Sequence, residues 1–159
     1  MLKLTKKADY GLMAVKHLAE FSGEGSCPAK DIAETYNIPL EALAKILQRL
    51  VKAGLLHSHQ GMNGGYALAR EPQRITALEV IRAIDGPLFI TGCLNHEIEC
   101  YQSPKCTVRE PLRKVNESIE QVLGRITISD LAETGATRAD SSEKEKPAHE
   151  LVGIASAGQ

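Results

Sequence analysis

The sequence lacks long apolar runs. It has 159 residues and is 43% hydrophobic, but Lys, Glu or Arg interrupts each apolar stretch well before the roughly 20 residues that a membrane span requires. No apolar block follows the first lysines, so we expect no signal peptide. These two absences predict a cytoplasmic protein with no membrane partner.

The sequence also lacks the common motifs of enzyme active sites. It contains no P-loop, no nucleotide-binding glycine pattern, no nucleophile elbow and no zinc-hydrolase motif. An enzyme is therefore not predicted. A strong charge of one sign is missing too, since the net charge is -1. Residues 1–70 nevertheless hold nine Lys or Arg against six Asp or Glu, so the N-terminal part is the positive one.

Cysteine is scarce but concentrated. Three of the four cysteines, Cys93, Cys100 and Cys106, lie in the stretch CLNHEIECYQSPKC. In a reducing compartment such a group favours a metal or redox site over a disulfide framework. The C-x6-C-x5-C spacing lacks the short C-x2-C pairs of structural zinc sites, whereas widely spaced thiolates suit an iron-sulfur cluster. A thiol-disulfide switch, zinc and inert thiols are the alternatives, and Cys27 is interpreted as a bystander.

Apolar spacing predicts three helices in the first third of the chain. The first covers residues 5–21, with a face formed by Tyr10, Met13, Ala14, Leu18 and Phe21. Two more helices follow within residues 29–56. They are separated where Asn37 suits a left-handed conformation and Pro39 suits the first turn of the next helix. The arrangement is a helix-turn-helix.

A hairpin and two further helices complete the expected fold. Short apolar runs flank the Gly- and Asn-rich stretch near residue 62, which predicts a two-stranded wing. A helix is predicted over residues 76–86. From Val108 to Ile126 apolar residues recur at steps of three or four, which predicts a long helix with a seam for a second copy.

The fold class predicted from these patterns is mainly α with a small β-hairpin. A winged helix-turn-helix DNA-binding domain is expected over residues 1–86, and a cysteine-rich, cluster-binding loop over residues 87–107. A dimerisation helix with an end segment is expected over residues 108–132. Residues 133–159 are poor in periodic apolar residues, so we expect a disordered tail.

The second helix of the pair and the wing are the predicted DNA-reading elements, because a helix fits the major groove and polar side chains there reach bases and phosphates. A solvated polar face is the alternative interpretation, but the wing and the local positive charge favour DNA. The predicted contacts are Lys3, Lys6 and Lys7 before and in the first helix; Pro39, Leu40, Glu41, Ala44, Lys45, Gln48 and Arg49 in the second helix of the pair; and His59, Gln60, Gly61, Asn63, Gly64, Gly65 and Tyr66 in the wing.

Several stretches together resemble the Rrf-two family of bacterial regulators over about residues 1–132. They are LTKKADYGLMAVKHLA, IAETYNIPLEALAKILQRLVKAGLL, GMNGGYALAR and ITALEVIRAIDG, followed by the three cysteines. The resemblance implies a winged-helix homodimer that binds a double-stranded DNA operator. It further implies a 2Fe-2S or 4Fe-4S cluster on Cys93, Cys100 and Cys106. The expected function is a cluster-sensing repressor of iron-sulfur assembly or of nitrosative and oxidative stress genes.

The resemblance leaves the fourth cluster ligand open. IscR-like members carry a histidine where this chain has Arg109, whose permanent charge excludes metal ligation. NsrR-like members use an aspartate of the other subunit, and Asp9 matches that position. Asp9 is the predicted ligand, His96 is the second choice, and 4Fe-4S is slightly favoured over 2Fe-2S. The alternative function is a cluster-free regulator of the same fold, switched by thiol oxidation or by a protein partner.

Overall fold

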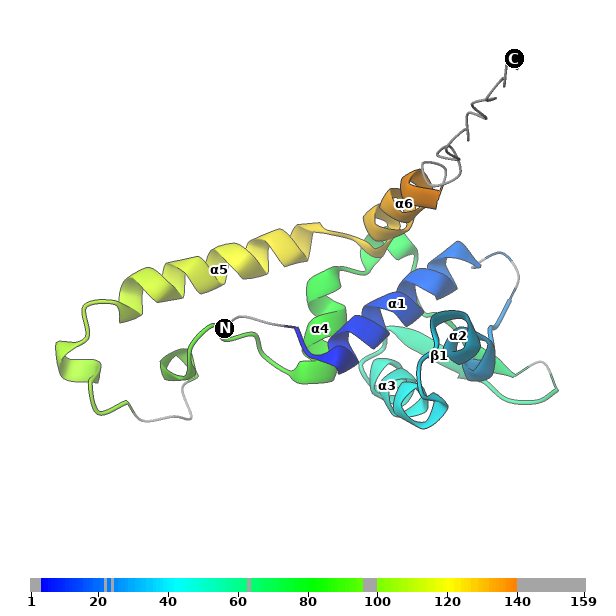
Figure 1. Ribbon diagram of the computed structural model, residues 1–159, viewed down its shortest axis with the longest axis horizontal. Coiled ribbons are helices and arrows are strands. Elements are labelled where there is room, and N and C mark those ends of the chain that lie inside the picture. Colours follow the sequence, from blue (N-terminus) through cyan, green and yellow to red (C-terminus); the bar gives the residue numbers. More distant parts are fainter. Residues whose placement is uncertain (1–3, 22, 24, 63, 96–99, 140–159) are drawn as a thin grey trace, which may run out of the picture.

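The computed structural model describes residues 4–21, 23, 25–62, 64–95 and 100–139, with the backbone alone for residues 134–139. The described residues form a head and an arm that extends from it (Figure 1). The head contains α1 (Lys6–Glu20), α2 (Ala29–Tyr36), α3 (Leu40–Lys52), β1 (Leu56–His59), β2 (Gly65–Leu68), α4 (Ala77–Asp85) and α6 (Ile128–Ala139). The arm consists of the cysteine loop, residues 87–107, and α5 (Arg109–Arg125). None of the described helices is long and apolar enough to cross a membrane.

Helix α1 begins at a polar cap and packs in the centre of the head. The Thr5 side chain accepts a hydrogen bond from the Ala8 backbone N–H at 3.2 Å, which satisfies one of the free donors of the first turn. The predicted buried face was partly wrong, because Met13 and Phe21 are 41% and 42% exposed. Since α3, α4 and α6 all pack against α1, the buried side is centred on Ala14 and Val15 instead.

The helix-turn-helix forms as predicted. Asn37 ends α2 in the left-handed conformation, with φ of 52°, and the Ile38 N–H closes the turn on the Ala33 carbonyl at 2.9 Å. Pro39 is the N-cap of α3, one position before the predicted first turn. Four apolar side chains of α3 are no more than 3% exposed: Leu43, Ile46, Leu47 and Leu50. Burial of each contributes about 1.5–3 kcal/mol to the stability of the head.

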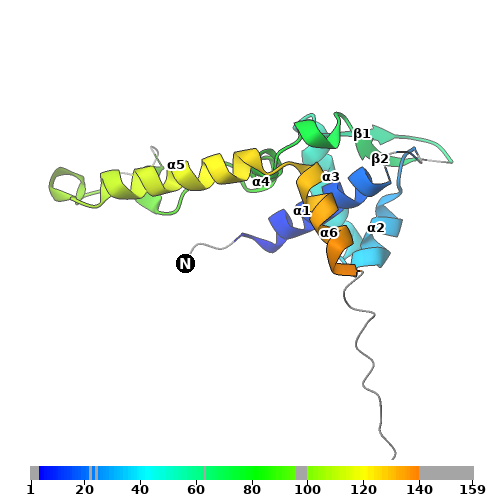
Figure 2. The same ribbon diagram turned by 90° about the horizontal axis from the view of Figure 1, so that it is seen from above.

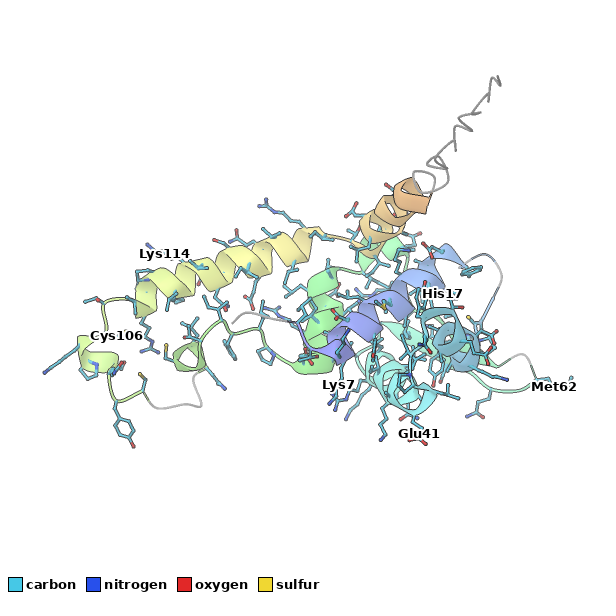
Figure 3. All side chains as sticks on the ribbon, viewed as in Figure 1. Lys7, His17, Glu41, Met62, Cys106 and Lys114 are labelled. Atoms are coloured by element: carbon cyan, nitrogen blue, oxygen red, sulfur yellow. The ribbon has the colours of Figure 1, made fainter. Side chains whose placement is uncertain are left out.

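The predicted wing is an antiparallel hairpin that runs from Leu56 opposite Leu68 to His59 opposite Gly65. Cys27 extends it, because its backbone exchanges two hydrogen bonds with Tyr66 at 2.9 and 2.8 Å. A Cβ on Gly65 would lie 2.5 Å from the Cys27 carbonyl oxygen, so this close approach requires glycine. Met62 lies fully exposed at the end of the wing (Figure 3).

Helix α4 begins with a capping box. The Glu79 N–H donates to the Thr76 hydroxyl at 3.2 Å, and the Glu79 carboxylate accepts from the Thr76 N–H at 2.9 Å. The predicted face of α4 is buried at Ile81 and Ile84 and half-buried at Leu78. Figure 2 shows α4 next to the point where α5 leaves the head.

The C-terminal part of the described chain differs from the prediction. The expected disordered tail began at residue 133, but α6 continues to Ala139, and the rest of that tail lies outside the described residues. Ile128 is completely buried in the head core, and its N–H donates to the Ile75 carbonyl at 2.9 Å. The Ala77 N–H donates to the Ile126 carbonyl, also at 2.9 Å. The head therefore includes α6 in addition to residues 4–86.

Candidate nucleic-acid interface and cysteine loop

Two grooves border the exposed polar side of α3. The first, of about 390 Å³, lies between the start of α1 and α3 and is lined by Lys7, Glu41, Lys45 and Arg49, among others. Lys7 and Glu41 lie on the same side of the head (Figure 3). Three of these four side chains are cationic, so this groove presents positive charge beside α3.

The second groove, of about 320 Å³, lies between α3 and the wing. Its lining includes Gln48 from α3 and His59, Gln60 and Tyr66 from the wing. A helix about 10–12 Å wide fits a major groove of about 12 Å, and the wing lies close enough to follow the neighbouring phosphates. The head therefore has the arrangement of a winged helix-turn-helix that reads duplex DNA.

Most of the predicted DNA-contacting residues are accessible. The exposed ones are Lys6, Lys7, Pro39, Leu40, Glu41, Lys45, Gln48, Arg49, His59, Gln60 and Gly61, and the half-buried ones are Ala44, Gly64, Gly65 and Tyr66. Lys3 and Asn63 lie outside the described residues. Tyr66 packs against the head core. Arg49 already has a protein partner, since its Nη1 donates to the Ile84 carbonyl at 2.8 Å.

The cysteine loop leaves the head after α4 and ends at the start of α5, at the far end of the arm (Figure 1). Cys93 is in a short 3-10 turn (Gly92–Leu94), and Cys106 directly follows another (Ser103–Lys105). Cys93, Cys100 and Cys106 are all half-buried free thiols. Cys106 and the wing residue Met62 lie at opposite ends of the molecule (Figure 3). Cys106 is thus remote from the DNA-reading side of its own head.

Helix α5 anchors the cysteine loop at two points that no pattern in the sequence predicted. Asn116 is 7% exposed, and its side-chain amide donates to the Leu88 carbonyl at 3.1 Å while its oxygen accepts from the Ile90 N–H at 3.0 Å. Arg109 donates to the Ser103 hydroxyl at 3.0 Å, just before Cys106. The residue that cannot ligate a metal therefore fixes the turn that precedes a candidate ligand.

Within the described part of one chain, the predicted ligands do not form a metal-binding group. Among the described residues, no three His, Cys, Asp or Glu side chains lie close enough together to hold a metal ion. Asp9 lies half-buried at the start of α1 in the head, and His96 falls outside the described residues. The Cys93 sulfur lies 2.9 Å from the Thr91 hydroxyl. None of the three thiols is in a disulfide, so the donor set is soft and available, as iron-sulfur binding requires.

The apolar seam on α5 is only partly covered. Val108, Val115 and Val122 recur every seven residues and are 57%, 48% and 58% exposed. They alternate with Leu112, Ile119 and Ile126, which are half-buried. A shallow groove of about 430 Å³ on α5 is lined by Val115, Ile119, Val122 and Leu123, together with Lys114 and Ser118. The predicted helix thus carries an exposed apolar row with heptad spacing.

Similar proteins identify the family. Residues 4–134 match the Rrf2 model, described as an iron-dependent transcriptional regulator. The chain is 34% identical to the transcriptional regulator IscR of Xenorhabdus nematophila, with 92% of each chain covered, and 32% identical to NsrR of Shouchella clausii, with 82% of this chain and 88% of the relative covered. The solved structure of CymR, the global cysteine regulator of B. subtilis, superposes with a TM-score of 0.70 at 34% identity, covering 84% of this chain and 98% of CymR. The chain belongs to the Rrf2 family of transcriptional regulators, and its fold is that of their winged-helix members.

Proposed function

We propose that this regulator senses an iron-sulfur cluster held on the cysteine loop and represses genes of cluster assembly or of nitrosative and oxidative stress. It acts in the cytoplasm as a homodimer on a double-stranded DNA operator. The observation that carries this proposal is the group of three uncommitted thiols on a loop anchored to α5 and joined directly to the DNA-reading head. Three half-buried thiols within one short stretch of sequence, none of them in a disulfide, suit an iron-sulfur cluster better than a structural role.

Operator reading is assigned to α3 and the wing. Glu41, Lys45 and Gln48 lie on the exposed side of α3. Glu41 suits cytosine, Lys45 suits guanine or a phosphate, and Gln48 suits adenine. The cationic groove with Lys7 beside α3 favours phosphate contacts. The predicted contact residues of the wing are assigned to the DNA backbone next to the major groove. Because two heads are needed to recognise two half-sites, operator binding depends on the dimer.

Dimerisation is assigned to α5. The exposed row of Val108, Val115 and Val122 is the kind of seam that a second copy of the same helix covers. We expect a partner to supply the fourth ligand, because the described residues of one chain bring no three His, Cys, Asp or Glu side chains together. We assign Asp9 of the partner subunit to this fourth ligand position, with His96 as the alternative. The three thiolates would hold the cluster, which supplies reactivity toward oxygen or nitric oxide when bound; 4Fe-4S is favoured over 2Fe-2S.

Cysteine substitutions test the assignment directly. Cys100→Ala should abolish anaerobic iron and sulfide retention, whereas Cys27→Ala should retain it. Cys27 is the matched control because burial, and then the nearby Asp31 carboxylate, raises the pKa of its thiol, which disfavours the thiolate that metals bind. The cysteine variants and the unsubstituted protein are then compared for their affinity for a DNA duplex selected from a random palindromic library. Equal iron content in Cys100→Ala and Cys27→Ala would contradict the ligand assignment.

A second candidate is a cluster-free regulator switched by thiol oxidation or by a protein partner. The observation that favours it is that the three cysteines do not come together among the described residues. The similarity to CymR, a global cysteine regulator, also supports it. This candidate predicts a colourless protein whose operator affinity changes after treatment with a mild oxidant and returns with a thiol reductant. The cluster-sensing protein would instead lose iron on the same treatment.

A further inference from the structure

Arg49 connects the DNA-reading helix to the base of the arm. It lies in the last turn of α3, and its Nη1 donates to the carbonyl of Ile84 at 2.8 Å. Ile84 lies in the last turn of α4, and the cysteine loop begins three residues later at Pro87. One hydrogen bond thus joins α3 to the segment from which the loop departs.

Helices α1, α3 and α4 meet at this point, which we call the arm junction. It consists of Thr5, Gly11, Arg49, Ile84 and Asp85. The Thr5 hydroxyl, which caps α1, lies 2.8 Å from both carboxylate oxygens of Asp85. A Cβ on Gly11 would collide with the Ile84 Cδ1, so α1 and α4 are in close contact here. Because packed interiors resist small displacements, a shift of the last turn of α4 must move its neighbours.

We propose that Arg49 is a positioning residue, which holds α3 against the end of α4 so that the cysteine loop and the DNA-reading helix move together. This inference rests on the proposed placement of α3 in the major groove. It assigns Arg49 a role different from the DNA contact expected from the sequence.

The chemistry of a helix C-terminus supports this role. The last four carbonyls of α4 have no partner within the helix, and they carry the negative end of its dipole. A guanidinium at this place satisfies one of them and is attracted by the dipole. Lys45 lies one turn before Arg49 on α3 and lines the same groove, so it is the matched cation for comparison.

Salt dependence separates a positioning residue from a phosphate contact. A side chain that binds a phosphate contributes about one unit to the slope of log affinity against log salt concentration. We expect Arg49→Met to weaken binding to the selected operator about tenfold while leaving this slope unchanged. Lys45→Met should lower the slope by about one unit. Arg49→Lys keeps the charge and a donor, and should recover part of the lost affinity at the same slope.

Coupling to the arm is measured with a second substitution. Asn116→Ala releases the segment that leads from the arm junction to Cys93. In the unsubstituted protein we expect Asn116→Ala to change operator affinity several-fold. In the Arg49→Met background the same substitution should have little further effect, because the link between loop and α3 is already broken. Circular dichroism at the binding temperature confirms that each variant is folded, and Arg49→Ala replaces Arg49→Met if the latter is not.

The outcomes are distinct. An unchanged slope with weaker binding and non-additive effects supports the inference. A slope reduced by about one unit in Arg49→Met would identify Arg49 as a DNA contact and overturn the inference. Unaltered operator affinity in Arg49→Met would also overturn the inference. So would additive effects of Arg49→Met and Asn116→Ala on that affinity. If Lys45→Met changes neither the slope nor the operator affinity, the placement of α3 in the groove is wrong, and the inference falls with the proposed function.

Discussion

The side-chain oxygen of Asn116 accepts a hydrogen bond from the backbone N–H of Ile90 across 3.0 Å. The same side chain donates to the Leu88 carbonyl, so one amide group pairs with a backbone acceptor and a backbone donor two residues apart in one segment. Asn116 is nearly buried between α5 and this segment. The backbone that leads to Cys93 is therefore fixed by Asn116, which lies 23 positions after Cys93 in the chain.

Asn116→Ala should free this segment. Two half-buried backbone groups would lose their partners, and each hydrogen bond contributes about 0.5–1.5 kcal/mol, so we expect a loss of about 1–3 kcal/mol in the free energy of unfolding. The amide of Ile90 should exchange with solvent faster than in the unsubstituted protein, as measured by hydrogen exchange with mass spectrometry. Ser118→Ala, two positions later on α5 at an exposed site, is the control and should leave the exchange unchanged. Equal exchange in both variants would rule out the anchoring role.

Ile128→Ala should test whether α6 belongs to the head. Ile128 is fully buried, and truncation of such a side chain costs about 2–5 kcal/mol through lost burial and the cavity left behind. Urea unfolding measures the change. Met62→Ala removes an apolar side chain at the exposed end of the wing and should change the free energy by less than about 0.5 kcal/mol. A similarly small loss in Ile128→Ala would mean that α6 is not docked.

Val115→Glu should disrupt the dimer that we assign to α5. Val115 lies in the middle of the exposed apolar row, where a buried carboxylate without a partner would be strongly unfavourable. Light scattering after size-exclusion chromatography should give a monomer for this variant at micromolar concentration. Gln121→Glu, an exposed position on the same helix but outside the row, should leave the dimer intact. A monomeric unsubstituted protein would contradict the assignment before any variant is made.

His17 makes the stability of the head pH-dependent. It is 7% exposed and its Nδ1 lies 3.2 Å from the Tyr36 hydroxyl. Burial lowers the pKa of His17 below its ordinary value of 6.5; Glu20 and Asp31 oppose this effect and Lys16 adds to it. The folded head therefore binds fewer protons than the unfolded chain as the pH falls below 6.5. The stability contributed by neutral His17 is present above this pH and lost below it.

The matching experiment compares urea midpoints at about pH 7.5 and about pH 5.5. We expect the midpoint to fall on acidification, and to fall less in His17→Gln, which keeps a polar group near Tyr36 but does not titrate. His57 and His59 are exposed on the wing, so His57→Gln serves as the control and should retain the full fall. Identical falls in all three proteins would contradict the assignment to His17.

The sequence predicted those parts of the fold that depend on local signals. Thr5, Asn37 and the glycines of the wing act within a few residues, so helix starts, the turn and the hairpin were correct. The buried side of α1 was partly wrong because it depends on which helices pack around it, and α6 was missed because its docking relies on Ile75, some fifty residues earlier. The partners of Arg49 and Asn116 are backbone groups far along the chain, which no spacing pattern reveals.

An anaerobic absorption spectrum of freshly purified protein, with iron and sulfide analysis of the same sample, decides whether this regulator carries an iron-sulfur cluster. We expect a brown protein with about four irons and four sulfides per chain, or about two of each for the smaller cluster, and loss of both in Cys100→Ala. A colourless protein that takes up neither iron nor sulfide on anaerobic reconstitution would contradict cluster sensing and leave the three cysteines as a thiol switch.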